Sequence, residues 1–214
     1  ERTQSSIPFV GLHAHSGTGS PFDGLGYPGE HMDFAYQNGN DALALTDHGN
    51  MNGFAYQVQH AQKMMKEGKD FKPIFGVEAY FLPSIEEWRQ ELERAKEDKK
   101  AKKSIDKSAS GTTIENEENK REVKNILNRR RHLILLAQNQ TGLNNIFSLV
   151  SKSYREENFY RFPRIDYAML KEHNEGVIAA SACLGGVYAG NFWENREKGD
   201  EAVLNAMRET TRNM

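Results

Sequence analysis

The chain has 214 residues, enough for one domain with a sizeable hydrophobic core. Its formal net charge of −2 argues against a general polyanion binder, so any nucleic-acid contact would be local. Hydrophobic residues make up 37% and charged residues 27%, no run of 18 apolar residues occurs, and Cys183 is the only cysteine. A membrane-spanning helix and an internal disulfide are therefore excluded, and we expect a cytoplasmic protein with no membrane partner.

The first part of the chain alternates strand and helix patterns. Short apolar runs predict strands over 7–12, 41–46 and 73–82. Helices are predicted from Pro28, which suits a first helical turn, to Gly39, and over 51–67, before a natural stop at Gly68. The buried face of the second helix is expected to consist of Phe54, Val58, Ala61 and Met65.

Composition changes between Ser84 and Arg131, where about half of the residues are charged and apolar residues are sparse. Such a stretch cannot bury much surface. We interpret it as an insertion, helical near 86–103 and mobile around 104–113. Its final basic run, 128–131, could contact phosphate, but a solvated end of the insertion is the favoured interpretation. The expected division is 1–83 and 132–214 as two parts of one domain, separated by 84–131.

Order returns with a predicted strand over 132–137 and a helix after it. That helix is expected to bury Leu143, Ile146, Phe147, Val150 and Tyr154. A short helix is predicted with Asp166 as its N-cap, then a strand over 176–181. The last helical pattern is expected to place inward Val203, Ala206 and Met207. Repeated strand–helix units predict an α/β fold with a parallel sheet, without separating an open sheet from a closed barrel.

Histidines follow two of the predicted strands. His13 and His15 are two residues apart at the end of the first strand, so their imidazoles project to the same side. Asp47 and His48 directly follow the second strand, at the strand edge where sites assemble in parallel α/β folds. His48 can bind a metal, and Asp47 can bind one or orient a neighbouring imidazole. Ordinary histidines and a polar turn, with Asp47 capping the next helix, are the alternatives.

Four further residues complete the candidate set. Glu78 is a carboxylate in an otherwise apolar strand, which is costly unless the group is paired, metal-bound or exposed at a sheet edge. His132 begins the next strand and could instead be a core histidine. Cys183 follows the last strand, where a buried packing cysteine is the alternative. Asp23 lies in the first loop, where simple turn chemistry would also account for it.

Together these residues place a metal-capable side chain beside every predicted strand. Several imidazoles, carboxylates and one thiolate suit Zn²⁺, Mn²⁺ or Fe²⁺ better than Ca²⁺ or Mg²⁺, and so many ligands imply more than one ion. Clustered ions of this kind favour phosphoester hydrolysis. The remaining histidines are assigned to structural roles on helices or at helix ends: His31, His60 and His173.

With these residues in place, the chain resembles the PHP domain (polymerase and histidinol phosphatase). It is most similar to the version in the C-family replicative polymerases, the bacterial DNA polymerase III alpha subunits. The resemblance extends from about Pro8 to Trp193 and breaks at the charged insertion. The segments that carry it are 9–16, 23–24, 42–51, 72–80, 132–139 and 141–143.

The resemblance implies a distorted seven-stranded (β/α) barrel with a divalent metal cluster, of two or three ions in a complete domain, at the strand ends. It implies metal-ligand roles for His13, His15, Asp23, His48, Glu78, His132 and Cys183. The family closes its site with a later Asp-x-His pair, and no such pair follows Cys183 before Met214. We therefore expect two of nine ligands and the last barrel strands to lie outside this chain, in a longer polymerase or the product of a split gene.

The resemblance also implies a function in DNA replication. The leading hypothesis is a metal-dependent phosphoesterase, a 3′→5′ proofreading exonuclease, or a scaffold for the polymerase. Its partners would be DNA and the remainder of the alpha subunit. A stand-alone phosphoesterase for a small substrate, of the histidinol phosphatase type, is the second hypothesis. A non-catalytic interaction module is the third.

Overall fold

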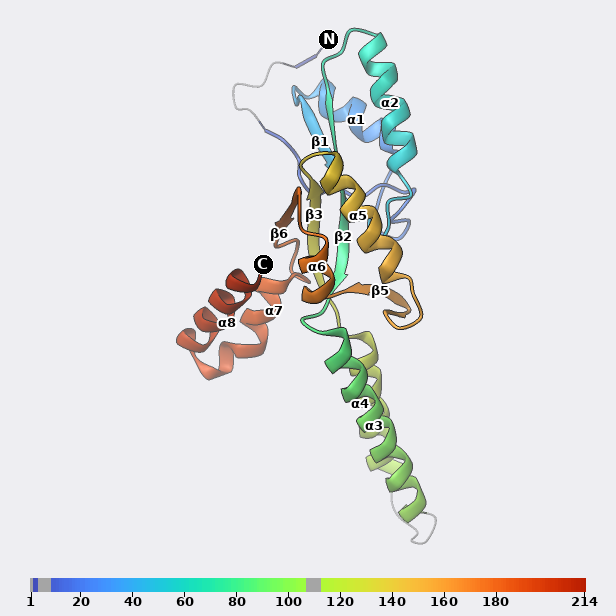
Figure 1. Cartoon of the computed structure of the whole chain (residues 1–214), viewed down its shortest axis with the longest axis vertical. Helices are drawn as coiled ribbons and strands as arrows, with labels where there is room; N and C mark the ends of the chain where they lie inside the picture. Colours follow the sequence, from blue (N-terminus) through green and yellow to red (C-terminus); the bar gives the residue numbers. More distant parts are fainter. Residues whose placement is uncertain (1, 4–8, 107–112) are drawn as a thin grey trace.

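The fold is taken from a computed structural model, which describes residues 2–3, 9–106 and 113–214 (Figure 1). Its strands are β1 (Ala42–Leu45), β2 (Lys72–Phe81), β3 (Arg131–Ala137), β4 (Phe159–Tyr160), β5 (Phe162–Ile165) and β6 (Val177–Ala180). They form one sheet in the order β4-β5-β2-β3-β6, with β1 also paired to β2. The long strand β2 is therefore the centre of the sheet. One of its edges pairs with β1 and then β5, and its other edge pairs with β3.

The sheet is mixed, and the expected parallel arrangement is wrong for three of the strand pairs. β2 runs parallel to β1 and β5, but β3 is antiparallel to both β2 and β6, and β4 is antiparallel to β5. The segment between β2 and β3 explains the direction of β3, because it leaves and returns at the same end of the sheet as a helical hairpin. A parallel neighbour would need a crossover to the opposite end. The seven-stranded barrel and its further strands stay predictions.

The first predicted strand is only partly described. Residues 7 and 8 lie outside the described part of the chain, and Gly11 forms a single parallel bridge with Leu43. The backbone nevertheless follows β1, since the amide of Ala44 donates to Gly11 and that of Thr46 donates to Ala14, both at 2.8 Å. This pairing brings the two histidines after Leu12 to the end of β1.

Helices α1 (Pro28–Gln37), α2 (Phe54–Lys66), α5 (Gln140–Ser153), α6 (Tyr167–Glu172) and α8 (Asp200–Asn213) confirm predicted helices. Asp166 caps α6 by accepting from the Met169 amide, as expected. The predicted face of α2 is wrong at its end, because Met64 is buried and Met65 is 69% exposed. Tyr154 likewise follows α5 as an exposed residue. Four elements were not predicted from the sequence: α7 (Val187–Asn195), the 3₁₀ helix (Arg196–Lys198), β4 and β5.

The two faces of the sheet are covered differently. Alternate residues of β2 and β3 pack against α5, and the main core consists of Val77, Ala79, Phe81, Leu133, Leu135, Ile146, Leu149, Ile165 and Val187. A second core under α1 and α2 contains Met32, Ala35, Leu43, Leu45, Met64 and Phe71. The face opposite α5 holds only a small apolar cluster around Ala44, Ile134 and Leu136. Glu78 and His132 lie on that face, by the alternation of strand side chains.

Helices α3 (Ile85–Asp106) and α4 (Thr113–Asn128) form a hairpin that projects from the sheet (Figure 1). The expectation that this segment buries little is wrong at its base. Ile85, Trp88, Leu92 and Ile126 form a core with Leu82, and the Trp88 indole donates to the Ile126 carbonyl at 2.7 Å. Of the stretch expected to be mobile, 104–113, the two ends belong to α3 and α4, and 107–112 lie outside the described residues.

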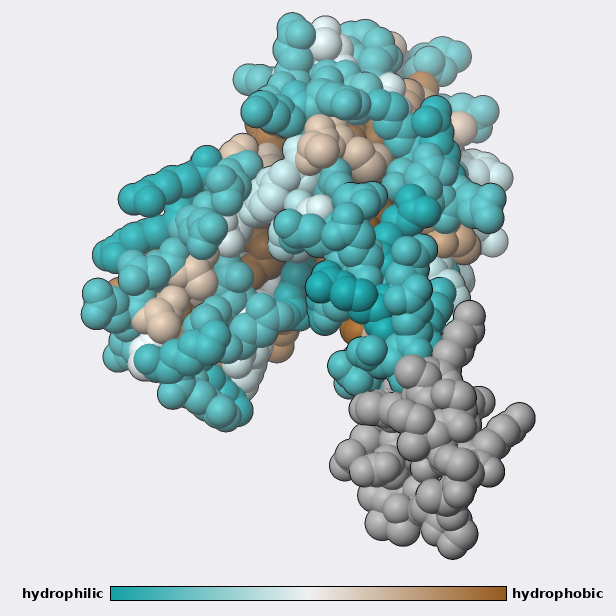
Figure 2. All heavy atoms as spheres, turned by 60° about the horizontal axis from the view of Figure 1, so that its bottom comes forward, coloured by the Kyte–Doolittle hydropathy of each residue, from teal (hydrophilic) through white to brown (hydrophobic). Residues whose placement is uncertain are grey.

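The surface in Figure 2 is mostly hydrophilic, with small apolar patches between the charged areas. None of the helices in the described ranges combines the length and apolar character that crossing a membrane requires.

Candidate metal centre

Glu78 lies at the centre of the candidate site. Its Oε2 is 2.6 Å from Nε2 of His13 and 3.0 Å from Nε2 of His15. Its Oε1 is 2.5 Å from Nδ1 of His132 and 3.7 Å from Sγ of Cys183. Nδ1 of His48 lies 3.7 Å from Oε2, and Nε2 of His48 is 2.8 Å from Oδ2 of Asp23. The structure therefore brings the other six predicted ligands together around Glu78, five of them directly and Asp23 through His48.

The strand pairing accounts for this convergence. His48 forms a parallel bridge with Glu78 just beyond β1, so the loop after β1 extends along β2. His132 lies at the start of β3 rather than at its end, and the antiparallel register places it opposite Tyr80, two residues along β2 from Glu78. Cys183 follows β6, which ends near the start of β3 for the same reason. The mixed sheet thus places the start of β3 and the ends of β1 and β6 at one edge.

Glu78 has no exposed surface, which makes its charge the dominant electrostatic feature of the site. Burial by itself raises the pKa of this carboxyl group, but hydrogen bonds from His132, His15 and His13 and the charge of His48 outweigh burial. The net effect holds the pKa of Glu78 well below its usual range. The Glu78 hydrogen bond in turn raises the pKa of His15, against an opposing effect of burial. A buried anion surrounded by imidazoles favours bound positive charge.

The donor set fits a metal. Three overlapping groups have ligand atoms within 4.8 Å of one another: His13, His15 and Glu78; His15, Asp23 and His48; and His48, Glu78 and His132. Nδ1 of both His15 and His48 is buried and has no hydrogen-bond partner among the described residues. An unpartnered buried ring nitrogen is costly in an apolar setting and suits a metal ligand. These residues could therefore hold divalent ions, whereas the role of each ligand stays a prediction.

Cys183 is exposed, not buried as a packing residue. Its Sγ is 3.5 Å from Nδ1 of His132 and accepts from the Gly185 amide at 3.4 Å. The residue before it, Ala182, has a φ of 59°, an uncommon conformation for a residue with a side chain. The strained backbone turns the thiol toward the cluster.

Asp47 contacts the loop after His15 and no imidazole in the described part of the chain. It is buried, and it accepts from the amide of Ser16 at 2.7 Å, the hydroxyl of Ser16 at 2.8 Å and the hydroxyl of Ser20 at 2.9 Å. Ser20 in turn accepts from the His48 amide at 3.0 Å. Asp47 thus fixes the loop that carries Asp23 beside His48. Sequence reasoning missed this contribution of the serines, although their place in a loop after two histidines was visible.

The histidines assigned to structure lie away from the cluster. His60 pairs with Asp33 at 3.0 Å, and His31 contacts the carbonyl of Leu25. Nδ1 of His173 lies 3.4 Å from the Asn145 side chain, at the end of α6.

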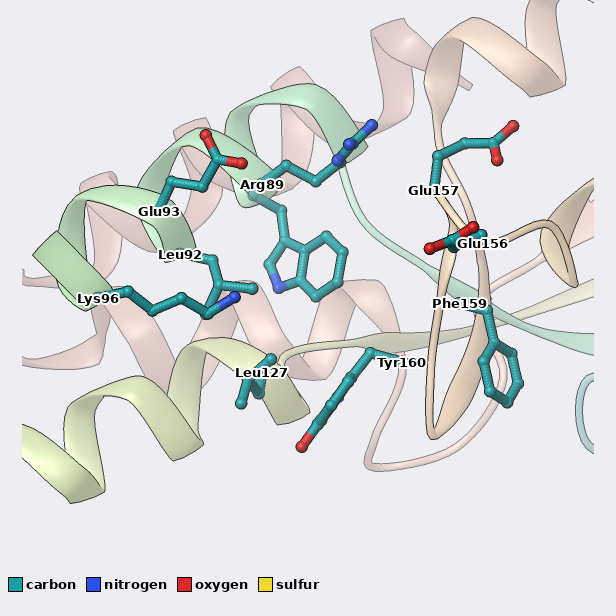
Figure 3. Close-up of a pocket in the computed structure, with 10 residues that line it drawn as sticks. Arg89, Leu92, Glu93, Lys96, Leu127, Glu156, Glu157, Phe159 and Tyr160 are labelled. Carbon is teal, nitrogen blue, oxygen red and sulfur yellow. The ribbon is translucent and has the colours of Figure 1, made fainter.

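Two sizeable cavities flank the loop between α5 and β5. A cavity of about 550 Å³ adjoins the cluster and is lined by Asp23, His48 and His132 together with aromatic and arginine side chains. The other, about 640 Å³, lies between α3 and the same loop, and Trp88 is among its lining residues. Figure 3 shows Leu92 and Glu93 of α3 and Phe159 and Tyr160 around it. It contains no histidine, and its rim carries Glu93, Glu156 and Glu157. The first cavity is therefore the one relevant to metal chemistry.

Comparison with known proteins identifies the family. The PHP domain family matches residues 11–213. The DNA polymerase III subunit alpha of Aquifex aeolicus is 35% identical over 183 residues, that of Borreliella burgdorferi 35% over 190, and that of Deinococcus radiodurans 34% over 163. The alignments cover 85%, 88% and 76% of this chain but only 13%, 13% and 10% of these relatives.

Among solved structures, an amidohydrolase from Chromobacterium violaceum matches 67% of this chain and 32% of its own, with 17% identity and a TM-score of 0.36. That similarity is too low to support an argument about fold. The sequence matches are sufficient by themselves: the chain belongs to the PHP domain family and is homologous to a region of DNA polymerase III subunit alpha.

Proposed function

We propose that this domain hydrolyses phosphodiester bonds at the 3′ end of DNA, with divalent ions bound by the cluster around Glu78. The observation that carries the proposal is the convergence of four imidazoles on one fully buried carboxylate. The homology to DNA polymerase III subunit alpha supports DNA as the substrate. Because the chain spans a small part of those relatives, we propose that the rest of the polymerase presents the DNA to the site.

The residues divide into two sets by the oxygen of Glu78 that they contact. His13, His15 and His48 lie on the Oε2 side, and His132 and Cys183 on the Oε1 side. Together these residues would hold more than one divalent ion. Bound divalent ions would lower the pKa of a coordinated water and offset the charge on the leaving oxygen.

The protein's own side chains would orient the substrate. His13 is partly exposed, with 31% of its side chain accessible, whereas Glu78 behind it is inaccessible. Substrate would approach from the side of Asp23, His48 and His132, which line the 550 Å³ cavity. Asp47 would maintain that approach by holding the loop of Asp23 in place.

The test is release of the terminal nucleotide from a 3′-mismatched primer by the metal-loaded protein. We expect cleavage by the wild type in Zn²⁺ or Mn²⁺ and none by His13→Ala or His15→Ala. His60→Ala is the matched control, since His60 pairs with Asp33 and lies outside the cluster. Turnover of small phosphomonoesters without cleavage of the primer would instead favour a small-molecule phosphoesterase. No cleavage by a metal-loaded full-length polymerase would contradict the nuclease function.

A further inference from the structure

The cavity beside the cluster has an aromatic wall that the metal chemistry does not need. Tyr154 and Phe159 stack with ring centroids 5.7 Å apart and an interplanar angle of 23°. Both rings remain exposed, 49% and 41%, although they line the cavity. Exposed stacked rings beside a polar site are the platforms on which single-stranded nucleic acids stack their bases.

Two arginines line the same cavity without an acidic partner. Among the described residues neither Arg130 nor Arg161 has a carboxylate within ion-pair distance, whereas the neighbours of Arg130 pair with Glu91 and Glu194. The prediction that the run 128–131 is a solvated end is wrong for Arg130, because its side chain is half-buried. Its guanidinium lies 3.7 Å from the centroid of Phe162, and its Nε is buried and has no hydrogen-bond partner in the described ranges.

Arg161 occupies the tip of the β4–β5 hairpin. Its φ of 58° lies in the left-handed region, which glycine would adopt with less strain. Phe159 pairs with Pro163 and Tyr160 with Phe162, so Arg161 is the single residue between the two strands. A strained, exposed arginine facing a catalytic cavity is unusual where glycine would serve the fold better.

The hairpin is held rigidly, so these groups have fixed positions. Arg164 is fully buried and donates to the carbonyls of Tyr160 at 2.9 Å and Phe162 at 3.0 Å. It also donates to Leu127 at 2.6 Å and Arg129 at 3.2 Å, which joins the hairpin to the end of α4. The aromatic rings and the two cations are therefore preorganised beside the cluster.

We propose that this cavity binds the terminal nucleotide of a single-stranded DNA, with the base against Tyr154 and Phe159 and the flanking phosphate between Arg130 and Arg161. The proposal rests on the proposed function, and it names the residues that would bind the nucleotide at that site. A small aliphatic phosphate ester would leave both the aromatic pair and the second cation unused. Beyond Phe159, the second cavity carries charges of both signs, Arg89 and Lys96 with Glu93, Glu156 and Glu157, and so has no net positive charge to attract a further phosphate (Figure 3).

The test measures binding of a short, labelled oligothymidylate whose last linkage is a slowly cleaved phosphorothioate. A second oligonucleotide lacks only the terminal base. We expect the wild type to bind the abasic oligonucleotide about tenfold more weakly, because stacking on an aromatic ring is lost. The double variant Tyr154→Ala, Phe159→Ala should bind both oligonucleotides equally, at the weaker level. Trp193→Ala is the matched control, since this ring is 55% exposed on α7.

The cations are tested through salt dependence. Arg161→Gly keeps the backbone conformation and should lower the slope of log affinity against log salt by about 0.7, the value for one single-strand phosphate contact. The control is Arg208→Ala on α8, for which we expect an unchanged slope. Alanine is used there because Arg208→Gly would be unfavourable in a helix. Oligouridylate in a parallel titration distinguishes RNA from DNA, and tighter binding of RNA would overturn the assignment to DNA.

If the double variant fails to fold, Tyr154→Leu is used in its place, because leucine retains apolar packing. Equal wild-type affinity for the two oligothymidylates would overturn the proposal, whatever the variants do. Elemental analysis of the same samples separates this result from failure of the proposed function. Bound metal with an affinity that does not depend on the terminal base would support the metal site and contradict the nucleotide subsite. Base dependence without bound metal would support the subsite while contradicting the hydrolase.

Discussion

Two faces of one strand carry the two kinds of burial in this protein. On one face of β2, Val77, Ala79 and Phe81 pack with α5 in the main core. On the other, Glu78 is equally inaccessible but is surrounded by imidazoles rather than by hydrocarbon. Adjacent residues of β2 lie in these two environments, because strand side chains alternate between the faces of the sheet. The comparison teaches that burial alone does not separate residues that support the fold from residues that carry the chemistry.

The largest effect is expected on the apolar face. Leu133→Ala removes a fully buried side chain of the main core and should lower the free energy of unfolding by about 3 kcal/mol. Urea denaturation measures the loss. Metal affinity of the folded variant should equal that of the wild type, because Leu133 faces away from Glu78. A folded Leu133→Ala protein that no longer binds metal would break the distinction between the faces.

The opposite result is expected for Glu78→Gln, where the larger effect should be on metal affinity. Glutamine keeps the shape of the side chain but removes the charge shared by the imidazoles, so Zn²⁺ affinity should fall at least about 100-fold. Calorimetric titration measures the Zn²⁺ affinity, and Glu172→Gln is the control, since Glu172 pairs with Lys152 at the surface. Affinity within threefold of the wild type, on the order of 0.6 kcal/mol, would show that Glu78 is a structural carboxylate.

The metal-free protein should show a pH dependence that originates on the polar face. The raised pKa of His15 means that its contribution to stability is complete below the unfolded value, about 6.5, and is lost as pH rises through the folded pKa. The lowered pKa of Glu78 means that its contribution is present above about 4.3 and is lost as pH falls through the folded pKa.

Stability from the cluster should therefore be greatest between about pH 4.3 and 6.5 and should decline toward pH 8. Thermal unfolding in the presence of a chelator measures this decline. Glu78→Gln should remove most of it, and Leu133→Ala should leave it in place. An identical decline in wild type and Glu78→Gln would assign the pH dependence to groups elsewhere.

A smaller effect is expected from Asp47, which reaches the cluster only through the loop. Asp47→Asn replaces an acceptor of the Ser16 and Ser20 hydrogen bonds by a donor, so the loop of Asp23 should loosen. We expect metal affinity to fall about tenfold, as for residues that orient metal ligands. Asp33→Asn is the matched control, because Asp33 pairs with His60 away from the site. Equal effects of the two substitutions would argue against a positioning role.

The smallest effect is expected at the tip of the β4–β5 hairpin. Arg161→Gly should stabilise the protein by roughly 0.5 kcal/mol, because relief of left-handed strain exceeds the added entropy of unfolding. Arg161→Val should destabilise it, since a β-branched residue tolerates this conformation poorly. Urea denaturation of both variants provides the measurement. A loss of stability in the glycine variant would show that the arginine side chain supports the fold.

Many of the strands and all residues of the cluster could be predicted from the sequence. Short apolar runs located β1, β2, β3 and β6, and the polar residues beside them identified all seven members of the cluster. Glu78 was informative because a carboxylate in an apolar strand needs a specific partner. The family resemblance added the metal and the expected substrate, and the PHP match over residues 11–213 confirms the family.

The rest depended on contacts between distant segments. Charge composition concealed the hairpin of α3 and α4, so the antiparallel direction of β3 could not be predicted. Helical periodicity misplaced the buried face of α2 by one residue, at Met64. Arg164 is buried because four backbone carbonyls surround it, and nothing in the local sequence marks such a position. Strands β4 and β5 are too short for an alternation pattern.

The central claim is that the polar face of β2 binds divalent metal. The most direct measurement is an anomalous difference map from crystals of the Zn²⁺-loaded chain. We predict strong peaks bounded by Glu78, His13, His15, His48 and His132, and no peak there in Glu78→Gln. Peaks only at surface carboxylates, or an undiminished peak at the cluster in Glu78→Gln, would contradict the account.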